Sequence, residues 1–355
     1  MAKQVKIKEI AKMAGVSAGT VDRVLHKRGK VSQASLEAVE RVLDEVGYRY
    51  NIHTSAISFR KTFNIAITIP NVNDGEYWNY IKRGINHAIE EYFDVNLKCD
   101  FHYYDQFDSK SCVEAYDNVL KAEPDAVIIG PTFIEETQHL CNELDSKNIP
   151  YIYVDSAIED TDPTAIFTTD HHACGMLAAK LLYMSIPQES TVAILLAERT
   201  GNRTSNNSIS RKAGVQAYME AVGLDDRLIY SSYVVGSHEQ TKKRIESLLD
   251  EHHDLKGISV LNSRGHVVAG ILQELGRQDV KLISFDLTEG NIKGLEEGYI
   301  TALLCQRPEL QGFHAIKTLI SHLLYKNIDR QTRYIMPIDV IFKENLPFYK
   351  EIINS

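Results

Sequence analysis

Short apolar runs alternate with amphipathic segments along most of the chain, from residue 63 onward. Seven runs have the length and apolar content of buried strands: NIAITIP, VNLKCDFHYY, DAVIIGP, IPYIYVD, TVAILLA, GISVLN and VKLISFD. Amphipathic segments at helical spacing separate them, at residues 77–92, 108–122, 134–147, 172–185, 209–222, 238–252 and 265–276. Strands that alternate with helices form parallel sheets covered by helices on both faces. The pattern therefore predicts an α/β fold with two sheets, and hence two lobes of one architecture.

The length and composition are those of a folded protein with several compact units. A chain of 355 residues is too long for one ordinary core, and 44% hydrophobic with 25% charged residues is typical of a soluble globular protein. No apolar run approaches membrane-spanning length, and the start MAKQVKIKEIAKMAG lacks the apolar core and cleavage site of a secretory signal. We therefore expect a cytoplasmic protein.

The charge is distributed unevenly between the two parts of the sequence. Residues 1–61 carry 12 Lys and Arg against 6 Asp and Glu, whereas the remainder carries 27 against 42. A basic head on an acidic body is typical of a nucleic-acid-binding module attached to another domain. A chance fluctuation in a short segment is the alternative, so the charge needs support from a motif.

The basic segment predicts three short helices in a helix-turn-helix arrangement. Their inward-facing residues are Ile7, Ile10, Ala11 and Ala14, then Val21, Val24 and Leu25, then Leu36, Val39, Val42, Leu43 and Val46. The first helix ends at Gly15, which permits the positive backbone angle of a tight turn, and Ala11 is small where two helices cross. Ser17 caps the second helix, which runs to about His26, and Ser32 caps the third.

The second helix would present its N-terminal residues to the major groove of DNA. Arg23 is the candidate for bidentate contact with a guanine. Residues placed to contact phosphates are Ser17, Thr20, His26 and Ser32. Asp22 would repel a nearby phosphate, but it could accept a hydrogen bond from a cytosine amino group or hold Arg23 in position.

A short helix at residues 51–59 could follow the three-helix segment. It is too short to be stable alone in water, so it would form only when two chains and DNA come together. Ile57 is its candidate for an apolar wedge between base pairs in the minor groove. The alternative is a plain linker that contains one apolar residue.

The runs IKEIAKMAGVSAGTVDRVLH and VSQASLEAVERVLDEVGY, followed by Asn51, resemble the headpiece of the lactose-repressor (LacI/GalR) family of bacterial transcription regulators. The resemblance implies a homodimer whose paired headpieces bind a palindromic operator in double-stranded DNA. It also implies hinge helices that enter the minor groove. Ile57 stands where the family has a wedge leucine, and Tyr50 stands where it often has a proline. Ala18 and Gly19 occupy the two main base-reading positions, so readout would depend on Thr20, Asp22 and Arg23.

Polar residues follow several predicted strands of the body. Asp155 ends IPYIYV, Asn262 ends GISVL, and Asp286 ends KLISF. Ligands of parallel α/β folds bind where strands end and loops begin, which makes these residues candidates for ligand contacts. A single Asp at a strand end is more often a helix cap, but several that converge from two lobes favour a site.

The body resembles the type I periplasmic sugar-binding fold, most closely its ribose-binding branch, through SFDLTEGNIKGLEEGYITALLCQRPELQGFHAIKTL. The resemblance assigns the effector contacts Tyr77, Trp78, Asp155, Arg211, Asn262, Asp286 and Gln306, with Ser263 open as an alternative to Asn262. Carboxylates and guanidinium groups can bind adjacent hydroxyls bidentately, and an aromatic ring can cover the C–H face of a sugar. Trp78, the single tryptophan, could instead fill the core or an interface. Arg211 could instead be a solvated charge on the surface.

The sequence gives no support for an enzyme. It contains no Walker A sequence, GxSxG elbow, HExxH motif or paired Cys/His arrangement. The five cysteines are scattered, and adjacent histidines such as His171 and His172 point in different directions, so we expect no metal site and no cofactor. A solute-binding protein of a transporter is a rival, although it would need an export signal and no headpiece. A sugar-processing enzyme is a second rival.

These observations predict a division of the chain into three parts. We expect a helix-turn-helix headpiece at residues 1–50, a hinge at 51–62, and a two-lobed effector-binding and dimerisation domain at 63–355. Lobe 1 would comprise about 63–168 and 308–332, and lobe 2 about 169–305 and 333–355. Few basic residues accompany Arg211, which favours a neutral sugar or polyol, while a nucleobase or phosphorylated sugar stays open. The C-terminal NLPFYKEIINS lacks leucine heptads, which favours a dimer over a tetramer.

Overall fold

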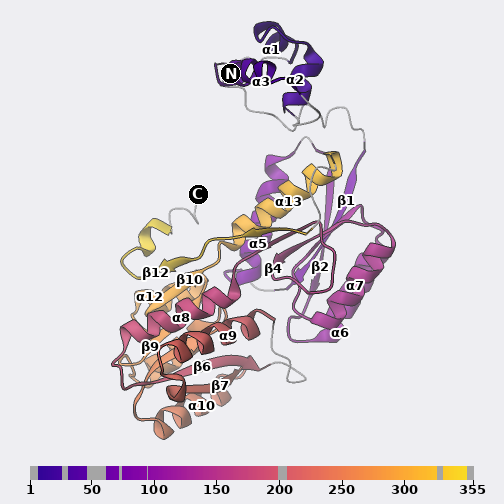
Figure 1. Cartoon of the computed structure of the whole chain (residues 1–355). Helices are drawn as coiled ribbons and strands as arrows, with labels where there is room; N and C mark the ends of the chain where they lie inside the picture. Colours follow the sequence, from indigo (N-terminus) through magenta and orange to yellow (C-terminus); the bar gives the residue numbers. More distant parts are fainter. Residues whose placement is uncertain are drawn as a thin grey trace. The chain divides into compact units, whose positions relative to one another are not determined.

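The computed structural model of the chain describes residues 7–25, 31–45, 61–71, 74–93, 95–198, 206–325 and 331–349 (Figure 1). Its contacts divide the chain into two compact units, residues 1–60 and residues 61–355. Each unit has hydrophobic core residues of its own. Among the described helices, none is long and apolar enough to cross a membrane.

The first unit contains three helices in the predicted helix-turn-helix order. They are α1 (Ile7–Met13), α2 (Ala18–Leu25) and α3 (Gln33–Glu45). Their shared core is formed by Ile10, Ala11, Val21, Val39 and Val42. Gly15 has a φ of 67° in the turn between α1 and α2, and the Ser17 hydroxyl accepts a hydrogen bond from the Thr20 amide at 3.1 Å. His26, Asn51 and Ile57 lie outside the described residues, so their roles stay predictions.

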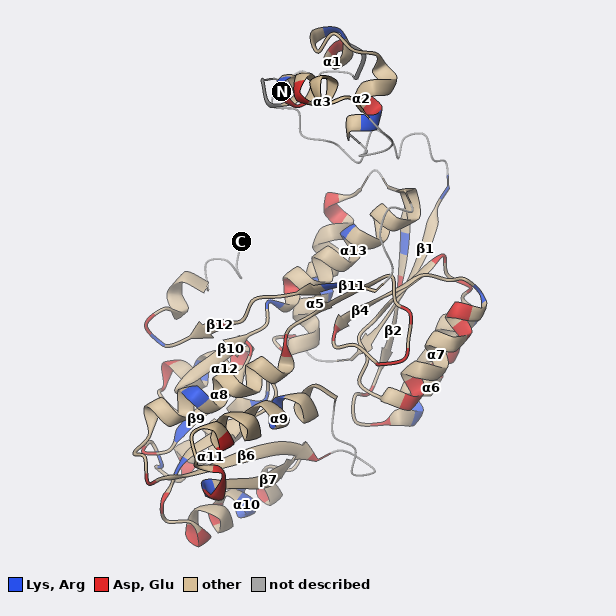
Figure 2. Cartoon of the chain, in the orientation of Figure 1, with Lys and Arg blue, Asp and Glu red and all other residues tan. Residues whose placement is uncertain are grey.

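Lobe 1 of the second unit is built on a parallel six-stranded sheet of order β11-β5-β4-β3-β1-β2. Its strands are β1 (Phe63–Pro70), β2 (Leu97–Tyr104), β3 (Ala126–Ile129), β4 (Tyr151–Asp155), β5 (Ala165–Thr168) and β11 (Thr332–Ile335). Its helices are α5 (Tyr77–Glu91) and α13 (Pro308–Tyr325), which pack together, and α6 (Ser109–Lys121) and α7 (Ile134–Ser146), which also pack together. Acidic residues occur along α6 and α7 (Figure 2).

Lobe 2 repeats this architecture with a sheet of order β12-β10-β9-β8-β6-β7, in which only β12 is antiparallel to its neighbour. Its strands are β6 (Thr191–Glu198), β7 (Leu228–Val234), β8 (Leu255–Val260), β9 (Lys281–Phe285), β10 (Ala302–Cys305) and β12 (Asp339–Ile341). Its helices are α8 (His171–Ser185), α9 (Asn206–Ala221), α10 (His238–Glu251), α11 (Gly265–Glu274) and α12 (Glu289–Glu296). The predicted α/β fold with a helix-turn-helix head and two parallel-sheet lobes is confirmed.

The chain passes between the two sheets three times, after β5, after β10 and after β11. The third passage lies at residues 336–338, because residues 333–335 continue β11 and pair with β5 of lobe 1. The sequence pattern put this passage three residues earlier, at 332, since four residues of strand carry no periodic signal of their own. Five strands, β5, β7, β10, β11 and β12, were not among the predicted apolar runs.

Two helix pairs pack so closely that only glycine fits at the contact. A Cβ added at Gly175 of α8 would lie 1.9 Å from the backbone oxygen of Arg211 in α9, and one at Gly214 would lie 2.0 Å from that of His172. Gly84 and Gly312 make the equivalent contact between α5 and α13 of lobe 1. The glycines therefore bring whole helices, and the polar residues that these carry, to fixed positions in each lobe.

Candidate functional site

All seven predicted effector residues line one inner cavity of about 70 Å³ in the body. They are Tyr77, Trp78, Asp155, Arg211, Asn262, Asp286 and Gln306. Asp155 ends β4 and Asp286 follows β9, at the carboxyl ends of parallel strands in the two sheets, where such folds bind their ligands. The cavity lies between residues of both lobes, so residues more than 200 positions apart in the sequence face the same space.

Arg211 is the most tightly held charged residue of the inner cavity. Its Nη1 donates to the Leu261 backbone oxygen at 2.8 Å, and its Nη2 donates to Gln306 Oε1 at 2.6 Å. The guanidinium carbon lies 4.0 Å from the centre of the Phe285 ring, within the range of a cation–π contact. Only 3% of the residue is exposed, which rules out the alternative of a solvated surface charge.

Asp286 is buried beside Gln306 and Arg211. Gln306 Nε2 donates to Asp286 Oδ2 at 2.9 Å, and the Gln306 backbone amide donates to Oδ1 at 3.3 Å. Burial raises the pKa of Asp286 to about 7, although the positive charge of Arg211 opposes this shift. The backbone of Asp286 has a φ of 64°, a left-handed geometry that turns the chain out of β9 into the cavity wall.

Asp155 has the corresponding position in lobe 1, with a φ of 72° directly at the end of β4. Tyr77 Oη donates to its Oδ1 at 2.5 Å, and Asn207 Nδ2 donates to its Oδ2 at 2.6 Å. Burial raises the pKa of Tyr77 well above its usual value, and the Asp155 charge adds to the shift. Because Asn207 is on α9 of lobe 2, this carboxylate connects the lobes.

Trp78 contributes an aromatic wall to the cavity. It is 4% exposed and packs on Gly130, where an added Cβ would lie 2.5 Å from the indole ring. Its ring meets that of Tyr77 edge-on, with 5.4 Å between centroids.

Asn262 is held in place by two hydrogen bonds. Its Oδ1 accepts from Tyr233 Oη at 3.0 Å and from the Arg264 amide at 2.9 Å. Asn262 and Ser263 both line the cavity, so geometry keeps both as candidates.

Several residues of the site were not predicted from the sequence; among them, Asn207 lines the inner cavity, and His171 contacts the Asp155 backbone and the Arg211 guanidinium. His171 Nε2 lies 2.9 Å from the Asp155 backbone oxygen, which can only accept, so this nitrogen carries the proton and Nδ1 accepts from Arg211 Nη2 at 3.2 Å. Burial and the Arg211 charge lower the pKa of His171 to about 3, which keeps the ring neutral. His171 begins α8 and Asn207 lies in the first turn of α9, so the strand-end pattern that led to Asp155 and Asp286 carries no signal for them.

A larger outer cavity of about 210 Å³ adjoins the inner one. Residues that line both are Tyr77, Trp78, Gln106, Ser208, Asn262 and Ser263. Contacts between the lobes border it: Arg264 Nη2 lies 3.6 Å from Glu76 Oε2, and the Glu289 amide donates to the Gly75 oxygen at 3.2 Å. The outer cavity is therefore enclosed by both lobes.

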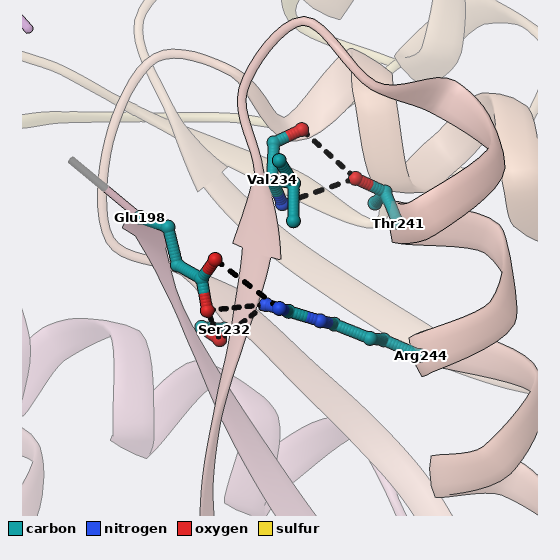
Figure 3. A network of polar contacts seen from close by, with 5 residues as sticks. All are labelled: Glu198, Ser232, Val234, Thr241 and Arg244. Atoms are coloured by element: carbon teal, nitrogen blue, oxygen red, sulfur yellow. Dashed lines mark hydrogen bonds and ion pairs between the residues drawn. The ribbon is translucent and has the colours of Figure 1, made fainter. Parts of the chain in front are cut away.

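A polar network fixes the ends of β6 and β7 next to the outer cavity, which Ala197 lines (Figure 3). Arg244 Nη2 donates to Glu198 Oε2 at 3.1 Å, while Arg244 Nη1 donates to the Ser232 hydroxyl at 2.7 Å. The Ser232 hydroxyl in turn donates to Glu198 Oε1 at 2.8 Å, and the hydrogen bonds from Arg244 and Ser232 lower the pKa of Glu198. The network has a structural role, because the Glu198 carboxylate is already hydrogen-bonded to other protein side chains.

The candidate DNA-contacting residues lie at the start of α2 in the headpiece. Ser17, Ala18, Gly19 and Arg23 are exposed, whereas Thr20 and Asp22 are half-buried. The hydroxyls of Ser17 and Thr20 are 2.9 Å apart, and Arg23 Nε donates to the Gly19 oxygen at 3.1 Å. Arg23 would have to leave this intrahelical contact to reach a base. Ser32 accepts from the Ser35 amide at 3.3 Å, as expected of an N-cap for α3.

Comparison with known proteins decides the family. A model for the "Periplasmic binding protein domain" matches residues 65–327, and one for "Bacterial regulatory proteins, lacI family" matches residues 6–51. The crystal structure of a protein described as a LacI transcriptional regulator, from Bacteroides fragilis, is 31% identical over 81% of this chain and 100% of that one, with a TM-score of 0.77. The chain belongs to the LacI family of bacterial regulatory proteins.

Other LacI-family relatives match over most of the chain. The transcriptional regulator DegA of Bacillus subtilis is 28% identical over 69% of this chain and 70% of its own, and the ribose operon repressor of Halalkalibacterium halodurans is 22% identical over 95% and 96%. A structure titled "transcriptional regulator CelR-cellobiose complex" shares the fold, with a TM-score of 0.61 at 18% identity over 95% of this chain and 98% of that one. This LacI-family protein is a DNA-binding transcriptional regulator, and these relatives are regulators rather than enzymes.

Proposed function

We propose that the protein is a sequence-specific repressor whose operator affinity is controlled by a small neutral sugar or polyol in the inner cavity. The proposal rests on one buried hydrogen-bond donor and one buried hydrogen-bond acceptor in the site. Arg211 Nε and Asn207 Oδ1 both belong to residues that line the cavity, and neither has a hydrogen-bond partner among the described residues. Buried polar groups are costly without partners, and one hydroxyl can both accept and donate.

The remaining contacts suit the same ligand. Asp155 and Asp286 offer carboxylate oxygens to adjacent hydroxyls, while Trp78 offers an apolar ring to a sugar face. Relatives support the class of ligand by their names, which include a ribose operon repressor and a regulator in complex with cellobiose. A nucleobase or a phosphorylated sugar is the alternative effector, and a transporter-associated binding protein or a sugar-processing enzyme is the less favoured function.

The DNA side of the proposal assigns roles to the headpiece, taken as residues 1–50, and to a hinge at 51–62. Arg23, Thr20 and Asp22 would contact bases, and Ala18 and Gly19 would leave their positions unread. Phosphate contacts are assigned to Ser17, His26 and Ser32, and minor-groove contacts to Asn51 and Ile57. A homodimer would place two headpieces on a palindromic operator in the cytoplasm, on the nucleoid.

Regulation would act through the two lobes of residues 63–355. A ligand bound by both lobes stabilises one relative arrangement, which reorients the paired headpieces and changes operator affinity. Coupling between two such sites is typically worth about 1–3 kcal/mol.

A thermal-shift screen of monosaccharides, polyols, nucleobases and sugar phosphates on the full chain tests the effector class. A specific ligand raises the apparent stability by mass action, and Trp78 fluorescence reports its arrival directly because no other tryptophan exists. We expect hits among neutral sugars or polyols. Hits confined to nucleobases would show that the effector is a nucleobase and not a sugar. Conversion of a hit into product would show that the protein is an enzyme.

A further inference from the structure

The outer cavity is larger than a single small effector in the inner cavity requires. It has about three times the volume, at about 210 Å³ against about 70 Å³, and the two share lining residues, including Trp78 and Ser208. A ligand held by Arg211 and Asp286 can therefore extend outward without leaving the space between the lobes. This inference rests on the proposed function, because it concerns a second part of the same effector.

The outer cavity has aromatic walls on which a second ring could stack. Trp78 lines both cavities, and Phe107 lines only the outer one. The Arg264 guanidinium carbon lies 5.3 Å from the Phe107 ring centre and reaches it from the other lobe. An aromatic ring bordered by polar groups is the usual surroundings of a sugar ring, since it covers the C–H face and leaves the hydroxyls to donors and acceptors.

Charge limits what this outer part can be. Three carboxylates line the outer cavity, those of Asp74, Glu76 and Glu289, against one guanidinium, that of Arg264, which is already paired with Glu76. His266 adds no charge near neutral pH, because burial lowers its pKa. The cavity is therefore net negative and repels phosphate or carboxylate groups.

Glu289 is held at this cavity by the backbone of the other lobe. Its amide bonds the Gly75 oxygen, and a Cβ added at Gly75 would lie 2.6 Å from the Glu289 carboxyl carbon. Gly75 also has a φ of 83°, a backbone conformation that favours glycine. The negative charge thus stays over the cavity as long as the lobes keep this contact.

We propose that the outer cavity is a second subsite, which binds an uncharged sugar unit linked to the one in the inner cavity and rejects phosphorylated sugars. The effector is then a neutral disaccharide or a longer glycoside. Monosaccharides fill only the inner cavity and bind more weakly, because they leave the Phe107 side of the site without contacts.

Trp78 fluorescence titration of the full chain tests this with a matched panel. D-glucose, D-galactose, D-mannose and D-xylose are each used as the free sugar, as a neutral disaccharide that contains it, and as its phosphate ester. We expect at least one disaccharide to bind ten times or more tighter than its component monosaccharides, and every phosphate ester to bind more weakly than the free sugar.

Two variants separate the subsites. Phe107→Ala should weaken the disaccharide at least fivefold and leave the monosaccharide unchanged, because Phe107 does not line the inner cavity. Glu289→Gln should reduce the discrimination against the phosphate ester at least threefold. Glu114→Gln, an exposed position on α6 away from both cavities, makes the same charge change and should have no effect.

The outcomes distinguish the two proposals. A monosaccharide that binds as tightly as every disaccharide overturns the second subsite and leaves the sugar sensor standing. A phosphate ester that binds tightest, or Phe107→Ala weakening both ligand classes equally, also overturns it. No binding by any sugar of the panel, together with no hit among the sugars and polyols of the thermal-shift screen, overturns sugar sensing itself, and the second subsite with it.

Discussion

At the scale of single residues, the surroundings of Arg211 contain an acid, Asp286, and a base, His171, whose pKa values are shifted in opposite directions. Burial raises the pKa of Asp286 to about 7 from 3.8 and lowers that of His171 to about 3 from 6.5. Both groups face Arg211, which lowers both values. Near pH 5 both are neutral in the folded chain and both are charged in the unfolded chain.

The two shifts contribute to stability with opposite signs. The raised pKa of Asp286 stabilises the fold below about pH 4, and this contribution is lost as the pH rises towards 7. The lowered pKa of His171 stabilises the fold above about pH 6.5, and this contribution is lost as the pH falls towards 3. Each amounts to roughly 4 kcal/mol at full extent, and between pH 4 and 6.5 their opposite pH dependences largely cancel.

Single substitutions should expose each contribution separately. Relative to the wild-type chain, Asp286→Asn should become more stable as the pH rises from 4 to 6.5, and His171→Gln should become less stable over the same range. Urea unfolding at a series of pH values, followed by Trp78 fluorescence, measures both slopes. Three parallel stability curves would show that neither group is perturbed in the folded state.

Asp22 lies about one helical turn after Ala18 and Gly19, the two positions that we propose leave their bases unread. Asp22→Ser should change which operator sequence is preferred more than it changes the total affinity, because a base contact carries sequence information and a phosphate contact does not. Selection of duplexes from a random pool, with each variant, measures the preference. Uniformly tighter binding to all sequences would show that Asp22 only repels the backbone.

At the scale of elements, the sequence predicts long apolar strands and amphipathic helices well and short strands poorly. β1, β4 and β9 are apolar runs that the sequence pattern places correctly, and the ends of β4 and β9 position Asp155 and Asp286. β5 has four residues, and β7 is only partly buried along its length, so neither stands out from a loop or a surface segment. His171 and Asn207 enter the site through helices, and their direction depends on how α8 packs on α9.

That helix packing can be tested through its glycines. Gly175→Ala would place a methyl group 1.9 Å from the Arg211 backbone oxygen, so we expect about 1–3 kcal/mol of destabilisation and weaker effector binding as α9 moves. Gly270→Ala is the control, because its methyl group meets nothing within 4 Å in α11 and should stabilise by up to about 1 kcal/mol. Equal effects in urea unfolding would contradict the close packing.

At the scale of the whole molecule, we propose that the effector cavity between the two lobes and the DNA-binding headpiece are energetically coupled. Residues from both lobes meet at Asp155, through Asn207, and at Glu76, through Arg264, so a ligand placed between them binds one arrangement of the lobes better than another. The family explains why such a body is joined to a helix-turn-helix.

The most direct test of this central claim is the operator affinity of the full chain, measured by fluorescence anisotropy with and without the effector found in the screen. We predict that the effector changes the wild-type affinity for a selected operator by about 5–150-fold. Arg211→Lys should bind the same operator normally without effector and show little change at that effector concentration, because its contacts in the cavity are lost. An effector that binds in the cleft but leaves the operator affinity unchanged, or equal affinity for all duplexes, would contradict the account.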